Sequence, residues 1–252
     1  MSLLAAAGVT KRFSGLTALD AVSLTVDAGE VVGLIGPNGA GKTTLFNVLY
    51  GVIAPDRGRV TFAGHDVSSL PVHKRARLGI GRTFQRIELF AGMTVRDHLL
   101  VAERARRADG GLLRDLLGRS APSSDERSRA AATLALLGLD DVADRPVESL
   151  SLGRGRLVEL GRALMIEPQL LLLDEPSSGL DHHETEDMAA VLETVRAERG
   201  TAILLVEHDV AMVREVTRRL YVLDFGQLIA EGPTAEVIGD PKVRQAYLGD
   251  TV

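Results

Sequence analysis

Three short runs of apolar residues, far apart in the sequence, restrict the possible folds of this chain more than any other feature. They occupy residues 31–35, 170–173 and 202–206. Because none of them alternates apolar with polar residues, each predicts a strand that is buried on both faces, as in a parallel sheet. A helical pattern of apolar residues lies next to each run, and parallel strands connected by helices form an α/β core.

The two ends of the chain predict further strands beside this core. Residues 1–8 are mostly apolar and precede the first positive charges, the reverse of a signal peptide, so we interpret them as a first strand. Residues 22–27 alternate apolar with polar side chains, which is typical of an antiparallel strand with one face in water. Residues 221–223 and 228–230 predict a terminal hairpin, and a short helix is expected from about Ala235.

The middle of the chain has a different pattern. Residues 94–165 are almost wholly helical in pattern, with Thr94 and Asp97 placed as a capping box and with breaks at 109–111 and 120–124. We therefore expect a single domain, 1–252, built in two parts. The parts are an α/β core with an antiparallel β subdomain, residues 1–85 and 166–252, and an inserted helical subdomain, residues 86–165.

Composition excludes several functional classes. The chain has no cysteine, which excludes disulfides, thiolate metal sites, iron–sulfur ligation and thiol nucleophiles. The net charge of −5 argues against a protein that works mainly by coating nucleic acid with basic side chains, so we expect no nucleic-acid partner. No window approaches the ~18 consecutive apolar residues that cross a bilayer, and we expect any membrane role to come through a partner.

The glycine-rich segment after the first buried run carries the strongest chemical signal. It fits G-x-x-x-x-G-K-[ST] and consists of Gly36, Pro37, Asn38, Gly39, Ala40, Gly41, Lys42, Thr43 and Thr44. Glycines without Cβ let backbone N–H groups surround the α- and β-phosphates of a nucleotide, and the N-terminus of the following helix adds its dipole. Lys42 reaches the β- and γ-phosphates, and Thr43 offers a hydroxyl to Mg²⁺. The segment predicts a P-loop NTPase core.

Polar residues also follow the other two buried runs. A carboxylate at the C-terminal end of a parallel strand lies beside the phosphate crevice, so Asp174 is expected to hold Mg²⁺ and Glu175 to polarise a water at the γ-phosphate. His208 follows the third run. The end of that strand lies at the same crevice, so we expect His208 to contact the γ-phosphate. His182 and His183 are adjacent and cannot share one helical face, which indicates surface residues rather than a metal pair.

These motifs resemble, over nearly the whole chain, the ATP-binding subunit of an ABC transporter. Further matching elements are Phe13 at the position that stacks on adenine, Gln85 in the glutamine loop 83–85, Ser151 and Gly153 in the signature motif, and Asp181 in the D-loop 178–181. The resemblance implies that ATP and Mg²⁺ are the cofactors, that Gln85 is a catalytic residue and a Mg²⁺ ligand, and that Asp181 contacts a second subunit.

The signature motif departs from the usual Leu-Ser-Gly-Gly-Gln, because Leu152 and Arg154 stand at its third and fifth positions. The resemblance places Ser151 and Gly153 against the γ-phosphate bound to the opposite subunit, through a hydroxyl and a backbone N–H at a helix N-terminus. Both residues are present, so we expect function to be retained. Arg154 puts the usual glutamine contacts in question, and with them the affinity of the partner's site.

A narrower similarity, within residues 70–95, around 111–120 and in 245–249, is to the ATPase subunits of branched-chain amino acid importers. It implies an ATPase that energises import of a small hydrophobic solute as a peripheral protein on the cytoplasmic face of the plasma (inner) membrane. The implied partners are a second ATPase subunit, identical or paralogous, integral membrane permease subunits and, indirectly, an extracytoplasmic solute-binding protein. Permease contact is expected in the groove beside Gln85, with Phe90 at its surface.

Three other functions stay open at this point. One is a soluble ABC ATPase of DNA repair or translation, which usually carries two cassettes or long coiled-coil insertions that this sequence does not show. Another is the ATPase of an exporter, such as a lipid exporter, which the narrower similarity disfavours. The third is a catalytically inactive regulatory subunit, and the presence of Lys42, Asp174, Glu175 and His208 argues against it.

Overall fold

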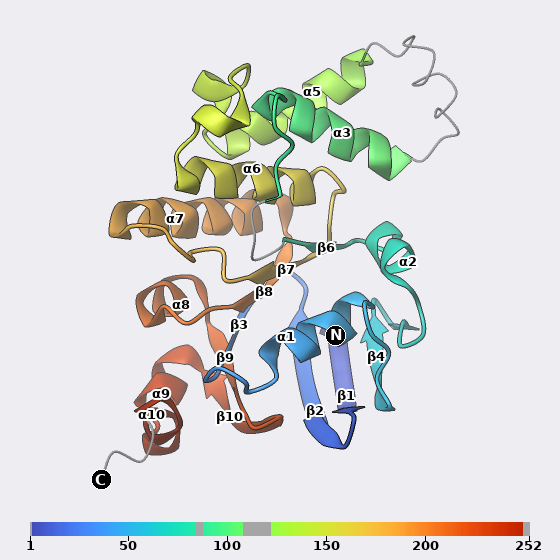
Figure 1. Ribbon diagram of the computed structural model, residues 1–252, viewed down its shortest axis with the longest axis vertical. Coiled ribbons are helices and arrows are strands. Elements are labelled where there is room, and N and C mark those ends of the chain that lie inside the picture. Colours follow the sequence, from blue (N-terminus) through green and yellow to red (C-terminus); the bar gives the residue numbers. More distant parts are fainter. Residues whose placement is uncertain (1, 84–87, 108–121, 249–252) are drawn as a thin grey trace.

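Two sheets and a group of helices make up the molecule (Figure 1). The computed structural model describes residues 2–83, 88–107 and 122–248. The elements are, in chain order, β1 (Ser2–Phe13), β2 (Leu16–Asp27), β3 (Val31–Ile35), α1 (Lys42–Tyr50), β4 (Arg57–Phe62), β5 (His65–Asp66), α2 (Val72–Arg77), β6 (Ile80–Arg82), α3 (Val95–Arg107), α5 (Ser124–Leu136), the 3₁₀ turns η1 (Asp140–Val142) and η2 (Val147–Ser149), α6 (Leu152–Leu164), β7 (Leu170–Asp174), α7 (His182–Arg199), β8 (Ala202–Val206), α8 (Val210–Val216), β9 (Arg219–Asp224), β10 (Gln227–Pro233), α9 (Thr234–Gly239) and α10 (Pro241–Leu248).

The core sheet has the strand order β10-β9-β3-β8-β7-β6. Its three central strands, β3, β8 and β7, are parallel and buried along their whole length, which confirms the prediction from the three apolar runs. The predicted terminal hairpin is formed by β9 and β10, and β9 extends the sheet by pairing in parallel with β3. The fold class is therefore α/β, with the carboxyl ends of the central strands at one edge of the sheet.

The antiparallel sheet, in the order β2-β1-β4-β5, lies beside the core sheet with α1 between them (Figure 1). Phe46 and Leu49 of α1 belong to one buried cluster with Leu4 and Val26 of the antiparallel sheet and with Val32 of β3. Burial of this apolar surface fixes α1 from both sides. The helix that follows the glycine-rich segment is thus held in a rigid position.

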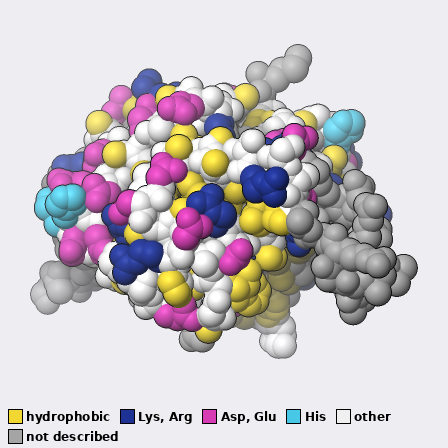
Figure 2. Space-filling model, turned by 90° about the horizontal axis from the view of Figure 1, so that it is seen from above, with side chains coloured by type: hydrophobic (Ala, Val, Ile, Leu, Met, Phe, Trp, Pro, Cys, Tyr) yellow, Lys and Arg dark blue, Asp and Glu magenta, His cyan; other side chains and the backbone are white. Residues whose placement is uncertain are grey.

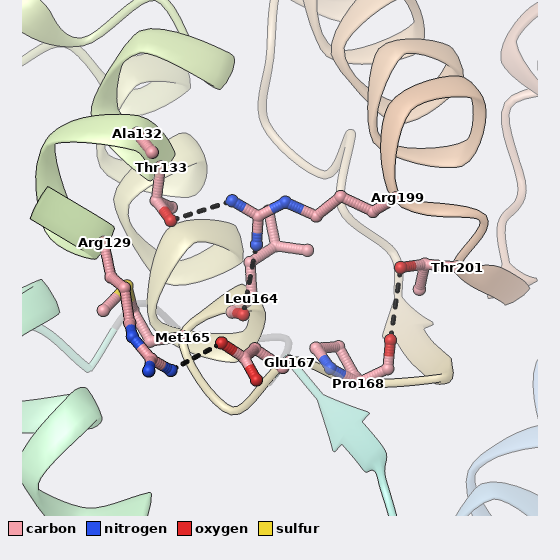
Figure 3. A pocket seen from close by; sticks show the side chains of 9 residues that line it. All are labelled: Arg129, Ala132, Thr133, Leu164, Met165, Glu167, Pro168, Arg199 and Thr201. Atoms are coloured by element: carbon pink, nitrogen blue, oxygen red, sulfur yellow. Dashed lines mark hydrogen bonds and ion pairs between the residues drawn. The ribbon is translucent and has the colours of Figure 1, made fainter. Parts of the chain in front are cut away.

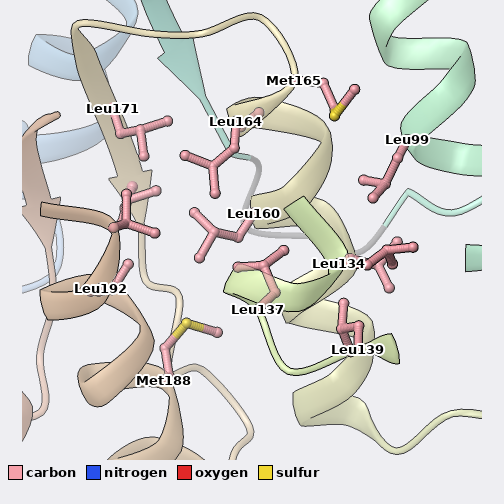
Figure 4. Packing of buried hydrophobic residues seen from close by; sticks show 14 of the residues in the cluster. Leu99, Leu134, Leu137, Leu139, Leu160, Leu164, Met165, Leu171, Met188 and Leu192 are labelled. Carbon is pink, nitrogen blue, oxygen red and sulfur yellow. The ribbon is translucent and has the colours of Figure 1, made fainter. Parts of the chain in front are cut away.

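Helices α3, α5 and α6 lie together at the other end of the molecule, and α7 runs between them and the core sheet (Figure 1). Leu99, Leu134 and Leu160 of these helices pack in one cluster with Leu171 of β7 and Leu192 of α7 (Figure 4). The apolar core is therefore continuous from the helices to the face of the sheet opposite α1. The division of the chain at residues 86 and 165 stays a prediction.

The helical region differs from its prediction in residues 137–151, which form turns and two short 3₁₀ segments rather than α-helix. Gly138, with a φ of 64°, ends the preceding helix, and Pro146 begins the second 3₁₀ segment. The predicted capping box is confirmed, because the Asp97 N–H donates to Thr94 Oγ1 at 3.1 Å and the Asp97 carboxylate accepts from Thr94 N.

Three sequence predictions fall wholly or partly on residues that the structure does not describe: the breaks at 109–111 and 120–124, and Gln85. Within the described ranges, no helix is both long and apolar enough to cross a bilayer.

Arg75 of α2 anchors the C-terminal end of α1. Its side chain is fully buried, and its Nη1 donates to the carbonyls of Val48 and Leu49 at 2.7 and 2.8 Å. The other guanidinium nitrogens donate to the carbonyls of Leu70 and Ser68. Burial lowers the pKa of Arg75 to about 10, so the side chain stays charged at neutral pH and complements the negative end of the helix dipole.

Replacement of this anchor should destabilise the fold. We expect Arg75→Met to lower the free energy of unfolding by about 2–5 kcal/mol, because buried carbonyls at the end of α1 lose their donors. Arg77→Met, on the exposed side of the same helix, should change it by less than about 0.5 kcal/mol. Urea titration of the nucleotide-free protein measures both, and equal stabilities would show that Arg75 does not hold α1.

Candidate active site

The glycine-rich loop between β3 and α1 is shaped by close backbone approaches. A Cβ on Gly36 would lie 2.0 Å from the carbonyl oxygen of Leu223, and one on Gly41 would lie 2.6 Å from that of Ala18. Gly226, in the turn between β9 and β10, donates its N–H to the Ala40 carbonyl at 2.9 Å. The loop is therefore enclosed by backbone from β2 and from the terminal hairpin, and no larger residue fits at Gly36 or Gly41.

The N-terminus of α1 is arranged to receive an anion. Gly41 is its N-cap, and no side chain caps the helix. The N–H groups of the first turn therefore have no side-chain acceptor, which is what a bound phosphate supplies. Lys42 folds back over the loop, and its Nζ donates to the carbonyls of Gly36 and Pro37 at 2.5 and 3.0 Å. The sequence predictions for residues 36–44 thus lie on one cradle, formed by the loop and the first turn of α1.

Two carboxylates lie at the end of β7, beside this cradle. Burial raises the pKa of Asp174, and the neighbouring Arg82 guanidinium opposes that rise. Burial lowers the pKa of Lys42, while the charges of Glu175 and Asp174 act in the opposite direction, so the three predicted residues are electrostatic neighbours. Thr43 and Asp174 offer hydroxyl and carboxylate oxygens, which suit Mg²⁺.

Glu175 has an unusual backbone conformation. Its φ is 50°, in the left-handed region that residues other than glycine rarely adopt, and its N–H donates to the Val206 carbonyl at 2.9 Å. Such strain is held by the surrounding structure and is concentrated at functional sites. The conformation turns the chain sharply after Asp174.

A buried glutamate connects the loops that follow β7 and β8. Glu207 is fully buried and accepts hydrogen bonds from Ser177 N and Oγ at 2.9 and 2.6 Å and from His208 N at 3.0 Å. His208 itself keeps a side chain that is 60% exposed, at the edge of the sheet where a ligand can reach it. Sequence reasoning missed Glu207, although an acidic residue directly after a buried strand was a visible signal.

The signature segment caps α6. Ser151 is the N-cap, and its Oγ accepts from Arg154 N at 3.4 Å, while Gly153 N donates to Glu184 Oε1 at 3.2 Å. Arg154 is directed away to Asp141, with 2.8 Å between Nη1 and Oδ2. Since α6 packs on the face of the core sheet opposite α1, the two helix N-termini lie on different sides of one chain.

The remaining predicted residues lie at the surface. Asp181 is the exposed N-cap of α7, and its Oδ1 accepts from Glu184 N at 2.9 Å. Phe13 is 45% exposed at the end of β1. His182 and His183 are exposed on α7, each beside a carboxylate one turn on, which confirms that they are surface residues.

A cavity of about 350 Å³ lies away from this site, where α5 and α6 approach the end of α7 (Figure 3). Its polar groups pair with one another: Arg129 contacts Glu167 at 2.7 Å, and Arg199 Nη2 donates to Thr133 Oγ1 at 3.0 Å. The cavity therefore belongs to the packing of the helices and has no part in the nucleotide site.

The parallel sheet, the phosphate cradle and the acidic strand end together define a P-loop nucleotide-binding ATPase. Comparison with known families narrows this class. Residues 19–178 match the ABC transporter family, and residues 227–252 match the family described as branched-chain amino acid ATP-binding cassette transporter.

Curated relatives match the chain over almost its full length. A high-affinity branched-chain amino acid transport ATP-binding protein, LivG of Salmonella typhimurium, is 41% identical, with 98% of both chains covered. The lipopolysaccharide export system ATP-binding protein LptB of Escherichia coli is 36% identical, with coverages of 99% and 98%.

Solved structures agree with these matches. The ADP conformation of an ATP-binding cassette of an ABC transporter has a TM-score of 0.88 at 34% identity and covers 99% of this chain and all of that chain. A dimeric cassette in a post-hydrolysis state with ADP and Pi has a TM-score of 0.75 at 26% identity, with coverages of 92% and 98%. The chain belongs to the ATP-binding subunit family of ABC transporters, and it binds and hydrolyses ATP.

The position of Glu175 leads to a test of its expected role. Because we assign Glu175 to the attacking water, Glu175→Gln should leave ATP binding intact while slowing hydrolysis at least ~10²-fold. Glu215→Gln, at an exposed position of α8, serves as the matched control and should hydrolyse ATP normally. Nucleotide affinity and turnover are measured on the same preparations, and near-normal turnover of Glu175→Gln would remove this residue from the mechanism.

Proposed function

We propose that this chain energises import of a branched-chain amino acid, as a peripheral subunit on the cytoplasmic face of the plasma (inner) membrane. The observation that carries the proposal is the match of residues 227–252 to the branched-chain family, because that segment lies outside residues 19–178, which match the general ABC transporter family. The similarity to LivG over 98% of the chain supports the same substrate class.

Catalysis rests on positioning and on charge neutralisation. ATP binds with its phosphates in the loop 36–44 and its adenine against Phe13. Lys42 leaves its carbonyl partners to contact the β- and γ-phosphates. Thr43, Asp174 and Gln85 would hold Mg²⁺, which when bound would neutralise phosphate charge. Glu175 orients the water.

His208 contacts the γ-phosphate from the end of β8. The buried Glu207 supports this role, because its hydrogen bond to His208 N fixes the backbone of the loop that carries the imidazole.

Two subunits face each other head to tail, so that each ATP lies between one chain's phosphate loop and the partner's signature segment. The packing of α1 and α6 on opposite faces of the core sheet supports this arrangement. In the head-to-tail pair, the α1 N-terminus at each ATP comes from one chain and the α6 N-terminus comes from the other. Ser151 and Asp181 are both exposed, as expected of residues at a subunit contact. Glu184 links the two segments, because it accepts from Gly153 N and donates its own N–H to Asp181 Oδ1. The solved relative that is described as dimeric supports the association of two subunits.

The shared site can be tested by complementation. Ser151→Arg should abolish hydrolysis while the isolated chain still binds nucleotide, because the residue acts on the partner's ATP. Lys42→Ala should instead weaken binding itself, and a mixture of the two variants should recover part of the activity by forming one intact composite site. Ser149→Arg is the matched control, at an exposed position two residues away, and should retain hydrolysis. Loss of ATP binding by Ser151→Arg alone would place Ser151 in its own chain's pocket.

A groove whose lining includes Thr83 is the proposed permease contact. It has a volume of about 260 Å³, and its lining includes Tyr50, Glu88 and Arg162. Phe90, 53% exposed, contacts Arg162 of this lining, with 5.5 Å between the guanidinium and the ring centroid. The Phe90 ring also stacks on the His98 ring, at 5.8 Å between centroids. An exposed aromatic ring fixed in this way suits the apolar face of a short permease helix.

Charged and apolar side chains are mixed on the face of the molecule shown in Figure 2. Dark blue and magenta groups alternate there, with yellow apolar groups exposed between them. Such a mixed surface suits contact with a protein partner better than contact with a polyanion.

Phe90→Asp tests both the contact and the transported solute. Assembly with the permease and ATP-dependent leucine uptake into proteoliposomes should be lost, while basal ATPase activity of the isolated chain stays within a few fold, because no nucleotide contact is removed. Val52→Asp, at an equally exposed apolar position, is the control. Pull-down, uptake and a thermal melt are measured together. Normal assembly would refute the docking role, and unfolding would show that the Phe90 side chain is needed for folding.

The similarity to LptB favours export of a lipid as the second candidate function. Leucine uptake into proteoliposomes separates import from export. The ATPase of an exporter would not support leucine uptake with any permease and solute-binding protein that it assembles with.

A further inference from the structure

Arg82 is a buried arginine that the proposed mechanism does not use. It ends β6, beside the end of β7, and its Nη2 lies 3.1 Å from Asp174 Oδ2. The side chains of Arg82 and Asp174 are only 6% and 8% exposed, so solvent does little to weaken the attraction. A charge pair of this kind is costly to bury, and its presence at the nucleotide site needs a reason.

The same guanidinium also contacts α1. Its Nη1 donates to Asn47 Oδ1 at 2.7 Å, and its central carbon lies 5.9 Å from the ring centroid of Phe46 and 5.7 Å from that of Tyr50. Arg82 therefore joins the carboxylate at the end of β7 to the helix that begins with Lys42 and Thr43. The planar guanidinium of Arg82 thereby fixes the position of β7 relative to α1.

The two protein ligands assigned to Mg²⁺ within the described residues stand on these two elements, the hydroxyl of Thr43 on α1 and the carboxylate of Asp174 on β7. Arg82 holds Oδ2 of that carboxylate and leaves Oδ1 for another partner. We propose that Arg82 is a positioning residue that sets Asp174 relative to α1 and thereby determines how tightly the ATP site takes up Mg²⁺. The inference rests on the proposed assignment of Mg²⁺ to Asp174.

A purely structural ion pair would act on stability alone, so the test must separate stability from Mg²⁺ uptake. Arg82→Gln removes the charge, while Arg82→Lys keeps it in an ammonium that cannot bridge Asn47 and Asp174 with a planar fork. Asn47→Ala leaves the charge pair intact and removes only the anchor to α1. Thermal melts without nucleotide report the folding of each variant.

Binding of adenylyl imidodiphosphate, an ATP analogue that is not hydrolysed, gives a readout independent of turnover. In EDTA, each Arg82 variant should bind it with nearly wild-type affinity, because no phosphate contact is lost. The Mg²⁺ concentration that gives half of the increase in affinity should rise about 10- to 100-fold in Arg82→Gln, as when a partner of a metal-binding carboxylate is removed. Arg82→Lys should lie between Arg82→Gln and wild type, and Asn47→Ala should show a smaller rise.

An unchanged or lower Mg²⁺ requirement in a folded Arg82→Gln would overturn the inference. If Arg82→Gln does not fold, Arg82→Lys decides by the same criterion. Asp174→Asn separates this outcome from failure of the underlying assignment: if that variant keeps the wild-type Mg²⁺ requirement, Asp174 is not a ligand and the inference falls with it. If Asp174→Asn loses the Mg²⁺ response and the folded Arg82 variants do not, only the positioning role is rejected.

Discussion

The parallel pairing of three buried strands brings the phosphate loop together with the residues that follow β7 and β8. Val206 of β8 is in register with Leu34 of β3 on one side and with Asp174 of β7 on the other, so the three strands end at one level. The residues that follow these ends, in the phosphate loop and after β7 and β8, are consequently neighbours although the chain separates them widely. Packing on both faces of the sheet fixes these strands, with α1 on one face and α6 and α7 on the other.

The buried charges at this edge of the sheet compensate one another. Burial disfavours the charged form of Lys42 and of Asp174, and each is sustained by opposite charge nearby. Arg82 supplies one positive charge from β6, and the loop carbonyls give the Lys42 ammonium its hydrogen bonds. The nucleotide-free site is thus already organised around compensated charge in a region that water reaches poorly.

The sequence was most informative where the determinants are local. The phosphate loop, its strand and its helix are contiguous, so spacing and glycine placement were enough to predict them, and the capping box of α3 was readable for the same reason. Arg82 and Glu207 could not be assigned in this way, because their partners Asp174 and Ser177 lie 92 and 30 residues away. Residues 137–151 were misread because apolar spacing outweighed Gly138 and Pro146, although both are ordinary signals for a helix end. The assignment of Ser151 to a partner's nucleotide came from family resemblance, since a single chain contains only half of such a site.

The enclosure of the phosphate loop by distant backbone has a consequence for affinity. The Leu223 carbonyl oxygen lies only 2.0 Å from the position of a Cβ on Gly36, and the Gly226 N–H donates to the Ala40 carbonyl, so the terminal hairpin restrains the loop. A flexible loop would have to be ordered on binding, at a conformational cost for each residue fixed. Here much of that cost is met when the chain folds, so more of the binding energy of the phosphates contributes to nucleotide affinity.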